Sequence, residues 1–164
     1  PIYHTFFDQA KKLNPRYLTM IMPARWYSGG KWLDDFRQSM LNDKRIRIIN
    51  DYPEASDCFP WVQIKWGVSY LLWDRDNQWD CTVNTLKNWN VVSTATRPLL
   101  EVGCETFIRY NEAIPILKKI QKFKEPSLSN QITSRKPFGL DTTFKGNVSK
   151  TNDSIILYQN GGTG

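Results

Sequence analysis

Two helical patterns, each followed by a short strand pattern, restrict the fold of this chain more than any other feature. Apolar residues recur at helical spacing over 3–13 and again over 33–41. Residues 17–22 form an almost wholly apolar run ended by Pro23, which is typical of a strand buried on both faces. In residues 45–50, Arg and Ile alternate before a further Ile, which also indicates a strand. A helix between two strands makes a crossover connection, so the sequence predicts a parallel sheet in an α/β fold.

Three further strand patterns follow, at 68–73, 81–86 and 90–94, and short polar segments separate them. Connections of that length usually join neighbouring antiparallel strands, so an antiparallel meander is expected beside the parallel sheet. Beyond a linker, residues 111–123 have the spacing of a helix with Lys on its outer face, and 154–158 indicate one last strand.

Composition places the chain among ordinary globular proteins. Apolar residues make up 40% of it and charged residues 23%, which excludes wholesale disorder. No run approaches the roughly 18 apolar residues of a membrane span, so we expect no membrane partner. Cys58, Cys81 and Cys104 form no C-x-x-C pair, and they are expected to be unpaired thiols in a cytoplasmic protein.

Positive charge is concentrated in the second half of the chain. The net charge is +6, from 22 basic and 16 acidic residues. Residues 118–150 hold eight Lys or Arg against two acidic residues, whereas residues 1–97 hold thirteen against ten. A basic half favours a polyanionic partner, although a solvated helix face is the commoner explanation of any single Lys cluster.

No set of residues in the chain forms a self-sufficient catalytic site. His4 is the only imidazole, and on an aromatic helix it is more often a partly buried or capping residue than a general base. Asp74 and Asp76 leave a metal site open as the alternative to a simple turn. The chain starts at Pro1 rather than Met and ends shortly after its last apolar run, so we expect a fragment of a longer protein.

One loop has the features of a ligand site. Phe59 precedes Pro60, and a residue before proline is held extended. The loop follows the strand at 45–50, and open α/β sheets bind ligands beyond the carboxyl ends of their strands. Phe59 is therefore a candidate for stacking on a flat ligand such as a nucleobase, the alternative being a ring that packs under its own loop.

Residues 1–97 resemble the second half of the catalytic domain of N6-adenine DNA methyltransferases from restriction-modification systems, the group marked by an Asn-Pro-Pro-Tyr motif. The order and spacing of helix, strand, proline, helix, strand, Phe-Pro loop and hairpin agree over the whole segment. The segments that carry the likeness are 3–10 (YHTFFDQA), 20–26 (MIMPARW), 36–37 (FR), 49–53 (INDYP), 57–60 (DCFP) and 68–75 (VSYLLWDR).

The resemblance implies a fold, a reaction and a cofactor. The fold is the C-terminal half of a Rossmann-like, S-adenosylmethionine-dependent methyltransferase sheet, a doubly wound variant whose last strand is antiparallel. The complete bacterial enzyme would transfer a methyl group from S-adenosylmethionine to N6 of a flipped adenine. Because the Asn-Pro-Pro-Tyr segment lies upstream of the first helix in this family, no catalytic residue is expected in this chain, and the fragment alone is expected to be inactive.

Two residues take a role from the resemblance. Phe59 matches the aromatic that stacks on the extruded adenine, an interaction worth about 1–3 kcal/mol per base. Phe6 matches the helix aromatic that borders the adenine ring of the methyl donor. Phe6 has an equally good explanation as a core residue of an amphipathic helix.

The resemblance also divides the chain into two domains. Residues 1–97 are the second half of the catalytic domain, and residues 98–164 are a linker helix and the truncated start of an α+β target-recognition domain. Arg135, Lys136 and Lys145 are candidates for phosphate contacts to double-stranded DNA. The implied protein partner is a restriction endonuclease, fused or separate.

Two other functions stay open at this point. One is a non-catalytic module that binds nucleic acid through aromatic and Lys side chains. The other is a methyltransferase that acts on RNA or protein. An Asn-Pro-Pro-Tyr motif within a few tens of residues before Pro1 would favour the DNA methyltransferase, and its absence would favour the binding module.

The chain departs from the family at five positions. The resemblance leads us to expect glycine at each of them, but the chain has tryptophan: Trp32, Trp61, Trp66, Trp79 and Trp89. Trp79 and Trp89 interrupt hairpin patterns at positions that usually need a positive φ, where a bulky residue is strained. Trp26 and Trp73 fall where large aromatics are expected. One hypothesis is that the source organism reads a stop codon as glycine; the alternative is an exposed stacking surface of real tryptophans.

Overall fold

A computed structural model describes residues 2–28 and 32–126 of the chain. The elements are α1 (Tyr3–Lys12), β1 (Tyr17–Pro23), the 3-10 helix η1 (Ala24–Tyr27), α2 (Asp34–Asn42), β2 (Ile46–Tyr52), the 3-10 helix η2 (Ala55–Asp57), β3 (Val68–Asp74), β4 (Cys81–Lys87), β5 (Asn90–Arg97) and α3 (Ala113–Gln121). None of the helices in these residues has the length and apolar character to cross a membrane. The strand predicted at 154–158 lies outside the described residues.

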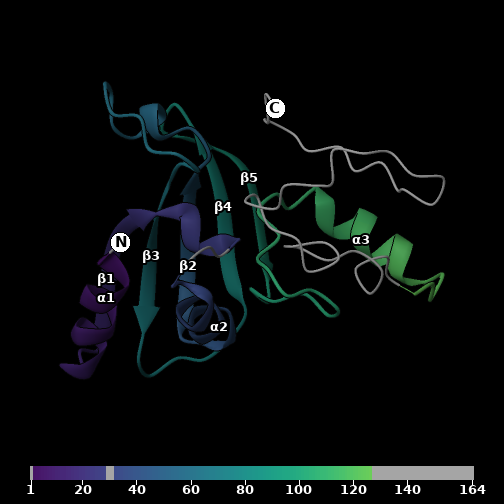
Figure 1. The fold of residues 1–164 in the computed structure, drawn as a ribbon, viewed down its shortest axis with the longest axis horizontal. Coiled ribbons are helices and arrows are strands. Elements are labelled where there is room, and N and C mark those ends of the chain that lie inside the picture. The colour runs from purple at the N-terminus through teal and green to yellow at the C-terminus, as the bar shows by residue number, and fades with distance from the viewer. Residues whose placement is uncertain (1, 29–31, 127–164) are drawn as a thin grey trace, which may run out of the picture. The chain divides into compact units, whose positions relative to one another are not determined.

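The five strands form one mixed sheet in the order β1-β3-β2-β4-β5 (Figure 1). β3 lies between β1 and β2 and is antiparallel to both, so that Met20 and Ile49 flank Leu71 from opposite sides. β1 and β2 are therefore parallel to each other, and β4 is parallel to β2 with Val83 beside Ile49. The predicted α/β class and the crossover from β1 through α2 to β2 are confirmed.

The predicted antiparallel meander of the three later strands is wrong for its first member. β3 does not pair with β4, because β2 lies between them, and only β4 and β5 form a hairpin. A short connection limits the distance between two strand ends, but it does not make the strands neighbours. Here the segment 75–80 passes the end of β2 instead.

The burial predicted for β1 is also wrong. β1 is an edge strand of the sheet, and Tyr17 and Ile21 are about half exposed, at 54% and 46%, while Met22 is buried. The strand buried on both faces is β3, where Val68 and Leu71 point to opposite faces and are each 1% exposed. An apolar run does not reveal whether a strand has one neighbour or two, because that depends on the pairing.

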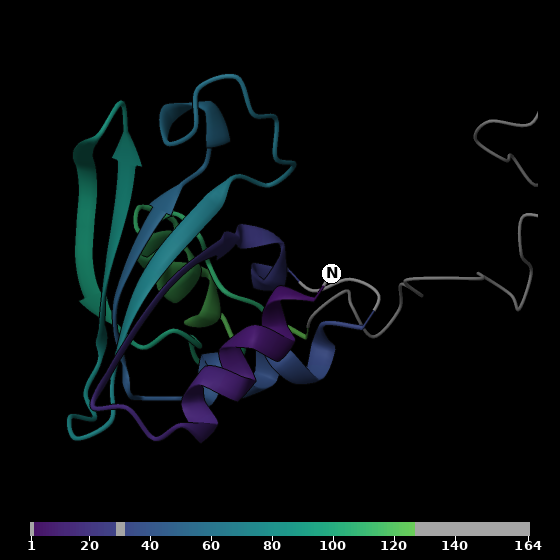
Figure 2. The same cartoon turned by 90° about the vertical axis from the view of Figure 1, so that its left-hand side faces the viewer.

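α1 and α2 cover one face of the sheet and enclose the main core (Figure 2). The helices contribute Phe7 and Phe36, whose rings meet edge to face at 6.0 Å, and the strands contribute Ile49 and Leu71. The helical spacing predicted for both segments is confirmed. Phe6, for which a core position is one of the two predicted explanations, is 61% exposed, because the helix turns the neighbouring Phe7 towards the sheet.

The compact unit that contains the sheet extends to residue 123. Leu99 and Phe107 join the main core beyond β5, and the ring of Phe107 lies 4.5 Å from that of Tyr27. The packing therefore continues past residue 97, where the catalytic part is predicted to end. The assignment of 98–164 to a recognition domain stays a prediction.

A buried ion pair attaches the segment after β5 to the sheet. The carboxylate of Asp51 on β2 is fully buried and accepts two hydrogen bonds from the guanidinium of Arg109, at 2.7 and 2.9 Å. This bidentate contact outweighs the effect of burial and raises the pKa of Arg109. Within residues 2–28 and 32–126, Arg109 is the charged partner of Asp51, so the buried carboxylate is paired only when residues 98–112 are in this place.

The backbone adopts positive φ at four of the five tryptophans where glycine is expected. The values are 73° at Trp32, 73° at Trp61, 78° at Trp66 and 65° at Trp89. Trp79 is not among them, so the positive φ predicted there is wrong. The reason is the strand order: 75–80 is not a hairpin turn, and the N–H of Trp79 instead donates to the carbonyl of Lys44 at 3.2 Å.

Replacing Arg109 with Met is expected to lower the free energy of unfolding by about 3–5 kcal/mol, because the Asp51 carboxylate stays buried without its partner. Urea unfolding of the chain measures this loss. Arg75→Met is the matched control, since it breaks an exposed pair with Asp76, and it should leave the free energy of unfolding almost unchanged. Equal losses in the two variants would contradict the role given to the buried pair.

Candidate functional site

The carboxyl ends of β1 and β2 lie at the same edge of the sheet, on either side of β3, because these two strands are parallel. β1 leads there into η1, and β2 leads into the loop 53–67, which contains η2 and returns the chain to β3 (Figure 1). The N–H of Ala24 donates to the carbonyl of Gly67 at 3.1 Å and so joins the two connections. Ligands of open α/β sheets bind outside the carboxyl ends of the strands, and this edge is the candidate site.

Phe59 lies in this loop with its ring partly exposed, at 37%. Its N–H donates to the carbonyl of Ala55 at 2.8 Å, and its carbonyl accepts from Val62 at 3.1 Å, so the backbone is held on both sides of the ring. Cys58, the residue before it, is buried and points into the protein. Phe59 belongs to neither hydrophobic cluster of the described residues, and its role as a stacking residue stays a prediction.

A second hydrophobic cluster anchors this loop to the sheet. Its buried members are Tyr52, Ala55, Cys58, Val68 and Leu86. Gly67 closes the loop with φ of +73°, and a Cβ atom at this position would lie 2.1 Å from the carbonyl oxygen of Tyr52. The loop is thus a packed structure that can hold the backbone of Phe59 in a fixed position.

Phe6 lies on α1, which begins beside η1 (Figure 2). The ring is 61% exposed while Phe7 is fully buried. The explanation of Phe6 as a core residue is therefore wrong. An exposed ring on this helix leaves a flat apolar face available to a ligand.

A buried polar layer lies on the inner side of this edge, and sequence reasoning missed it. Asp51, Ser69 and Thr85 are cross-strand neighbours on β2, β3 and β4, and each is at most 6% exposed. Burial, helped by the charge of Asp51, raises the pKa of Tyr27 well above its ordinary value, so this hydroxyl is neutral. The sequence signal that could have indicated this layer is Asp51 itself, a carboxylate near the carboxyl end of β2.

The residues predicted to contact DNA phosphates, Arg135, Lys136 and Lys145, lie outside the described residues. Their role stays a prediction. Asp74, the candidate metal ligand, instead accepts hydrogen bonds from the backbone of Asp76 and the amide of Asn77, at 3.1 and 2.6 Å. These are the contacts of a turn.

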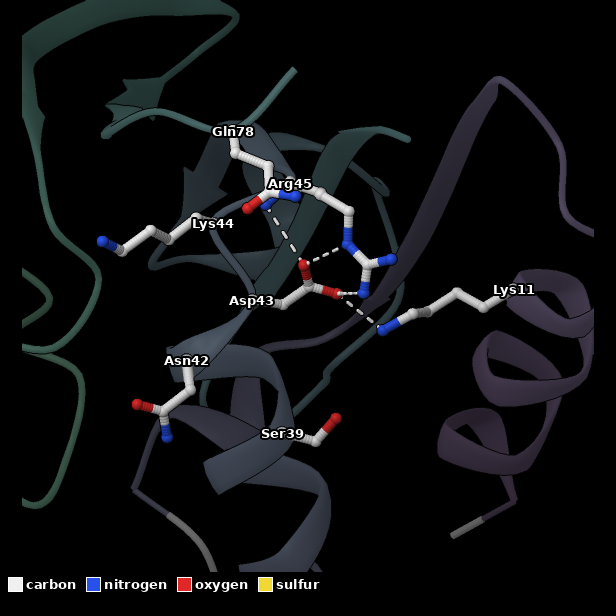
Figure 3. Close-up of a pocket in the computed structure, with 7 residues that line it drawn as sticks. All are labelled: Lys11, Ser39, Asn42, Asp43, Lys44, Arg45 and Gln78. Atoms are coloured by element: carbon white, nitrogen blue, oxygen red, sulfur yellow. Dashed lines mark hydrogen bonds and ion pairs between the residues drawn. The ribbon is translucent and has the colours of Figure 1, made fainter. Parts of the chain in front are cut away.

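A polar hollow of about 370 Å³ lies near the amino end of β2, and Figure 3 shows residues that line it. This end of β2 is opposite the end that leads into the loop of Phe59. The central group of the hollow is the carboxylate of Asp43, which accepts hydrogen bonds from Lys11 at 2.6 Å, from Arg45 at 2.7 and 2.9 Å, and from the indole of Trp73 at 3.0 Å. Burial raises the pKa of Asp43, but these hydrogen bonds outweigh it and hold the pKa well below its ordinary value. The partners of Asp43 come from α1, from β3 and from Arg45 just before β2, so we interpret this cluster as a structural junction.

Comparison with known proteins shows what the chain is similar to. Residues 1–59 match the model of the Eco57I restriction-modification methylase family, a segment that runs from α1 to Phe59. The chain is 35% identical over 85 residues to an uncharacterized adenine-specific methylase of Mycoplasma pneumoniae, and this match covers 51% of the chain and 20% of that relative. The predicted resemblance to restriction-modification adenine methylases is confirmed. The chain spans about a fifth of the length of this curated methylase.

Among solved structures, the chain is similar to the methyltransferase subunit of a type I restriction-modification system from Streptococcus thermophilus. The identity is 14% and the TM-score is 0.32, and the match covers 68% of this chain and 21% of that one.

Replacing Asp43 with Asn is expected to lower the free energy of unfolding by about 2–3 kcal/mol at pH 7, because hydrogen bonds to a charged acceptor are lost. The folded-state pKa is depressed, so the carboxylate stabilises the fold above about pH 4 and this contribution fades as the pH falls below that value. Urea unfolding of both proteins from pH 7 to pH 3 should show the difference narrowing in acid.

Asp8→Asn is the matched control, because Asp8 is exposed, and it should change the free energy of unfolding little at any pH. A difference between Asp43→Asn and the unmodified chain that is independent of pH would show that the ionised carboxylate is not the stabilising group.

Proposed function

We propose that the protein is an adenine-specific DNA methyltransferase of a restriction-modification system, which transfers a methyl group from S-adenosylmethionine to N6 of an adenine flipped out of the duplex. This chain contributes the edge of the sheet that meets the flipped base. The observation that carries the proposal is Phe59, a ring that is 37% exposed on an anchored loop at the carboxyl edge of β2. The family match to residues 1–59 supports it because the matched segment includes this residue.

Phe59 would hold the base by stacking. A flipped base loses its two stacking neighbours in the duplex, and a ring on the protein that replaces one of them lowers the free energy of extrusion by about 1–3 kcal/mol. Stacking requires an exposed ring face on a backbone that does not move with the ligand. The hydrogen bonds of Phe59 to Ala55 and Val62 meet the second requirement.

Phe6 would border the adenine ring of S-adenosylmethionine, which supplies the methyl group when it is bound. The fit rests on one observation, a ring 61% exposed at the helix that begins beside η1. Phe6 offers only apolar contact, so it would orient the adenine ring without binding the ribose or the amino-acid part. We assign no catalytic residue to the described part of the chain.

The remaining features of the proposal concern the complete protein. Arg135, Lys136 and Lys145 would contact the phosphates of double-stranded DNA from the target-recognition domain. The sheet of residues 1–97 would be the C-terminal half of a Rossmann-like methyltransferase fold, with β3 as its antiparallel strand. The protein would act in the bacterial cytoplasm beside a restriction endonuclease.

In the full-length protein, Phe59→Ala is expected to weaken base extrusion and to lower kcat/KM on duplex DNA roughly ten- to a hundredfold, because one stacking contact is lost. Fluorescence of 2-aminopurine at the target position measures extrusion, and methyl transfer measures turnover. Affinity for S-adenosylmethionine should change little. Phe59→Tyr keeps the ring and should retain extrusion.

Phe6→Ala is the matched control for this experiment. It should weaken S-adenosylmethionine binding and leave the 2-aminopurine signal almost unchanged. Unaltered extrusion and turnover in Phe59→Ala would refute the stacking role, whatever the effect of Phe6→Ala.

A further inference from the structure

The seven tryptophans of this chain fall into two groups. Trp26 and Trp73 are core residues, at 0% and 2% exposure. The other five are largely exposed: Trp32 at 84%, Trp61 at 100%, Trp66 at 56%, Trp79 at 73% and Trp89 at 66%. Tryptophan is the largest apolar side chain, so five exposed copies in one small unit require an explanation.

The second group also differs in its backbone. Four of its members, all except Trp79, have φ between 65° and 78°, the left-handed region that glycine occupies without strain. Bulky residues rarely adopt these angles, because Cβ approaches the neighbouring carbonyl. Trp26 and Trp73 do not adopt them. Three of the four lie in turns whose type is known.

Trp61 is the third residue of a turn that Phe59 begins. The N–H of Val62 donates to the carbonyl of Phe59 at 3.1 Å, and Pro60 occupies the second position. Proline fixes φ near −65°, so a positive φ at the next residue makes this a type II turn. Proline followed by glycine is the preferred pair at these two positions.

Trp66 occupies the same position in the next turn of the loop. The N–H of Gly67 donates to the carbonyl of Ile64 at 3.1 Å, with Lys65 second and Trp66 third. Lys65 is not among the residues with positive φ, whereas Trp66 is, which again defines a type II turn. Glycine is the residue expected in the third position.

Trp89 lies in the two-residue turn of the β4–β5 hairpin. Lys87 pairs with Asn90, and between them Asn88 and Trp89 have φ of 47° and 65°. Positive φ at both central residues defines a type I′ turn, for which Asn-Gly is the most favoured pair. The chain has Asn at the first position and Trp where glycine belongs.

An aromatic stacking surface for nucleic acid is the competing explanation, since strained residues do gather at functional sites. A stacking surface requires exposed rings, and a ring can be exposed whatever the φ of its residue. It does not explain why Trp61, Trp66 and Trp89 occupy the glycine positions of turns of two different types. Trp79 shows the contrast, because it is equally exposed and has ordinary φ.

We infer that the natural protein has glycine at positions 32, 61, 66 and 89, encoded by a stop codon that the source organism reads as glycine and that this sequence renders as tryptophan. Phe59 is then the single aromatic residue of the loop 53–67. The two turns of this loop, which begin at Phe59 and at Ile64, are then unstrained, and the exposed aromatic surface of the loop is reduced to the ring of Phe59. The inference rests on backbone geometry and does not depend on the proposed activity.

Peptide mass spectrometry of the protein purified from its source organism tests the inference. The expected result is glycine at 32, 61, 66 and 89 and tryptophan at 26 and 73, with UGA codons at the first four positions and UGG at the last two. Tryptophan at any of the four positions, or a UGG codon there, would overturn the inference and favour the stacking surface.

A measurement on the recombinant chain tests the strain separately. Trp61→Gly should raise the Tm, because the side chain is fully exposed and the backbone already has positive φ. Trp79→Gly is the matched control, and it should not raise the Tm, because φ at this exposed tryptophan is ordinary. A Tm for Trp61→Gly equal to or below that of the unmodified chain would contradict the assignment of position 61.

Discussion

The pairing of β3 with two strands at once is the constraint on which the rest of this structure depends. β3 hydrogen-bonds to β1 on one side and β2 on the other, antiparallel to both. Because β2 ends and β3 begins at the same edge, the loop 53–67 must close there, over the carboxyl ends of β1 and β2. The position of Phe59 is therefore a consequence of strand order, and a meander in which β3 followed β2 on its outer side would have moved the loop away from η1.

Rigidity at this edge has three local sources. The cluster around Tyr52 packs the loop from below, the hydrogen bond from Ala24 to Gly67 joins it to η1, and the close approach of Gly67 to Tyr52 leaves no room for a side chain. The buried pair of Asp51 and Arg109 attaches the segment after β5, residues 98–112, to the same sheet. A ring that must stack on an extruded base gains from such support, because little conformational entropy is lost on binding.

Sequence patterns predicted the elements of this fold better than their arrangement. Helical spacing located α1 and α2, and the Phe-Pro pair located the candidate ligand loop, because these signals are local. The order of the strands depends on pairings between distant residues, such as Met20 with Leu71, which no local pattern encodes. The same limit explains the misplaced burial of Phe6 and the missed pair of Asp51 with Arg109, two residues that are distant in sequence and adjacent only in the fold.

The central claim is that Phe59 contacts the base taken out of the duplex. Photo-crosslinking tests it most directly, with the full-length protein bound to a duplex that carries 5-iodouracil at the target position, followed by sequencing of the cross-linked peptide. The account predicts a cross-link within the tryptic peptide 48–65, at Phe59 itself. A cross-link confined to other residues, with the protein bound and the base extruded, would contradict it.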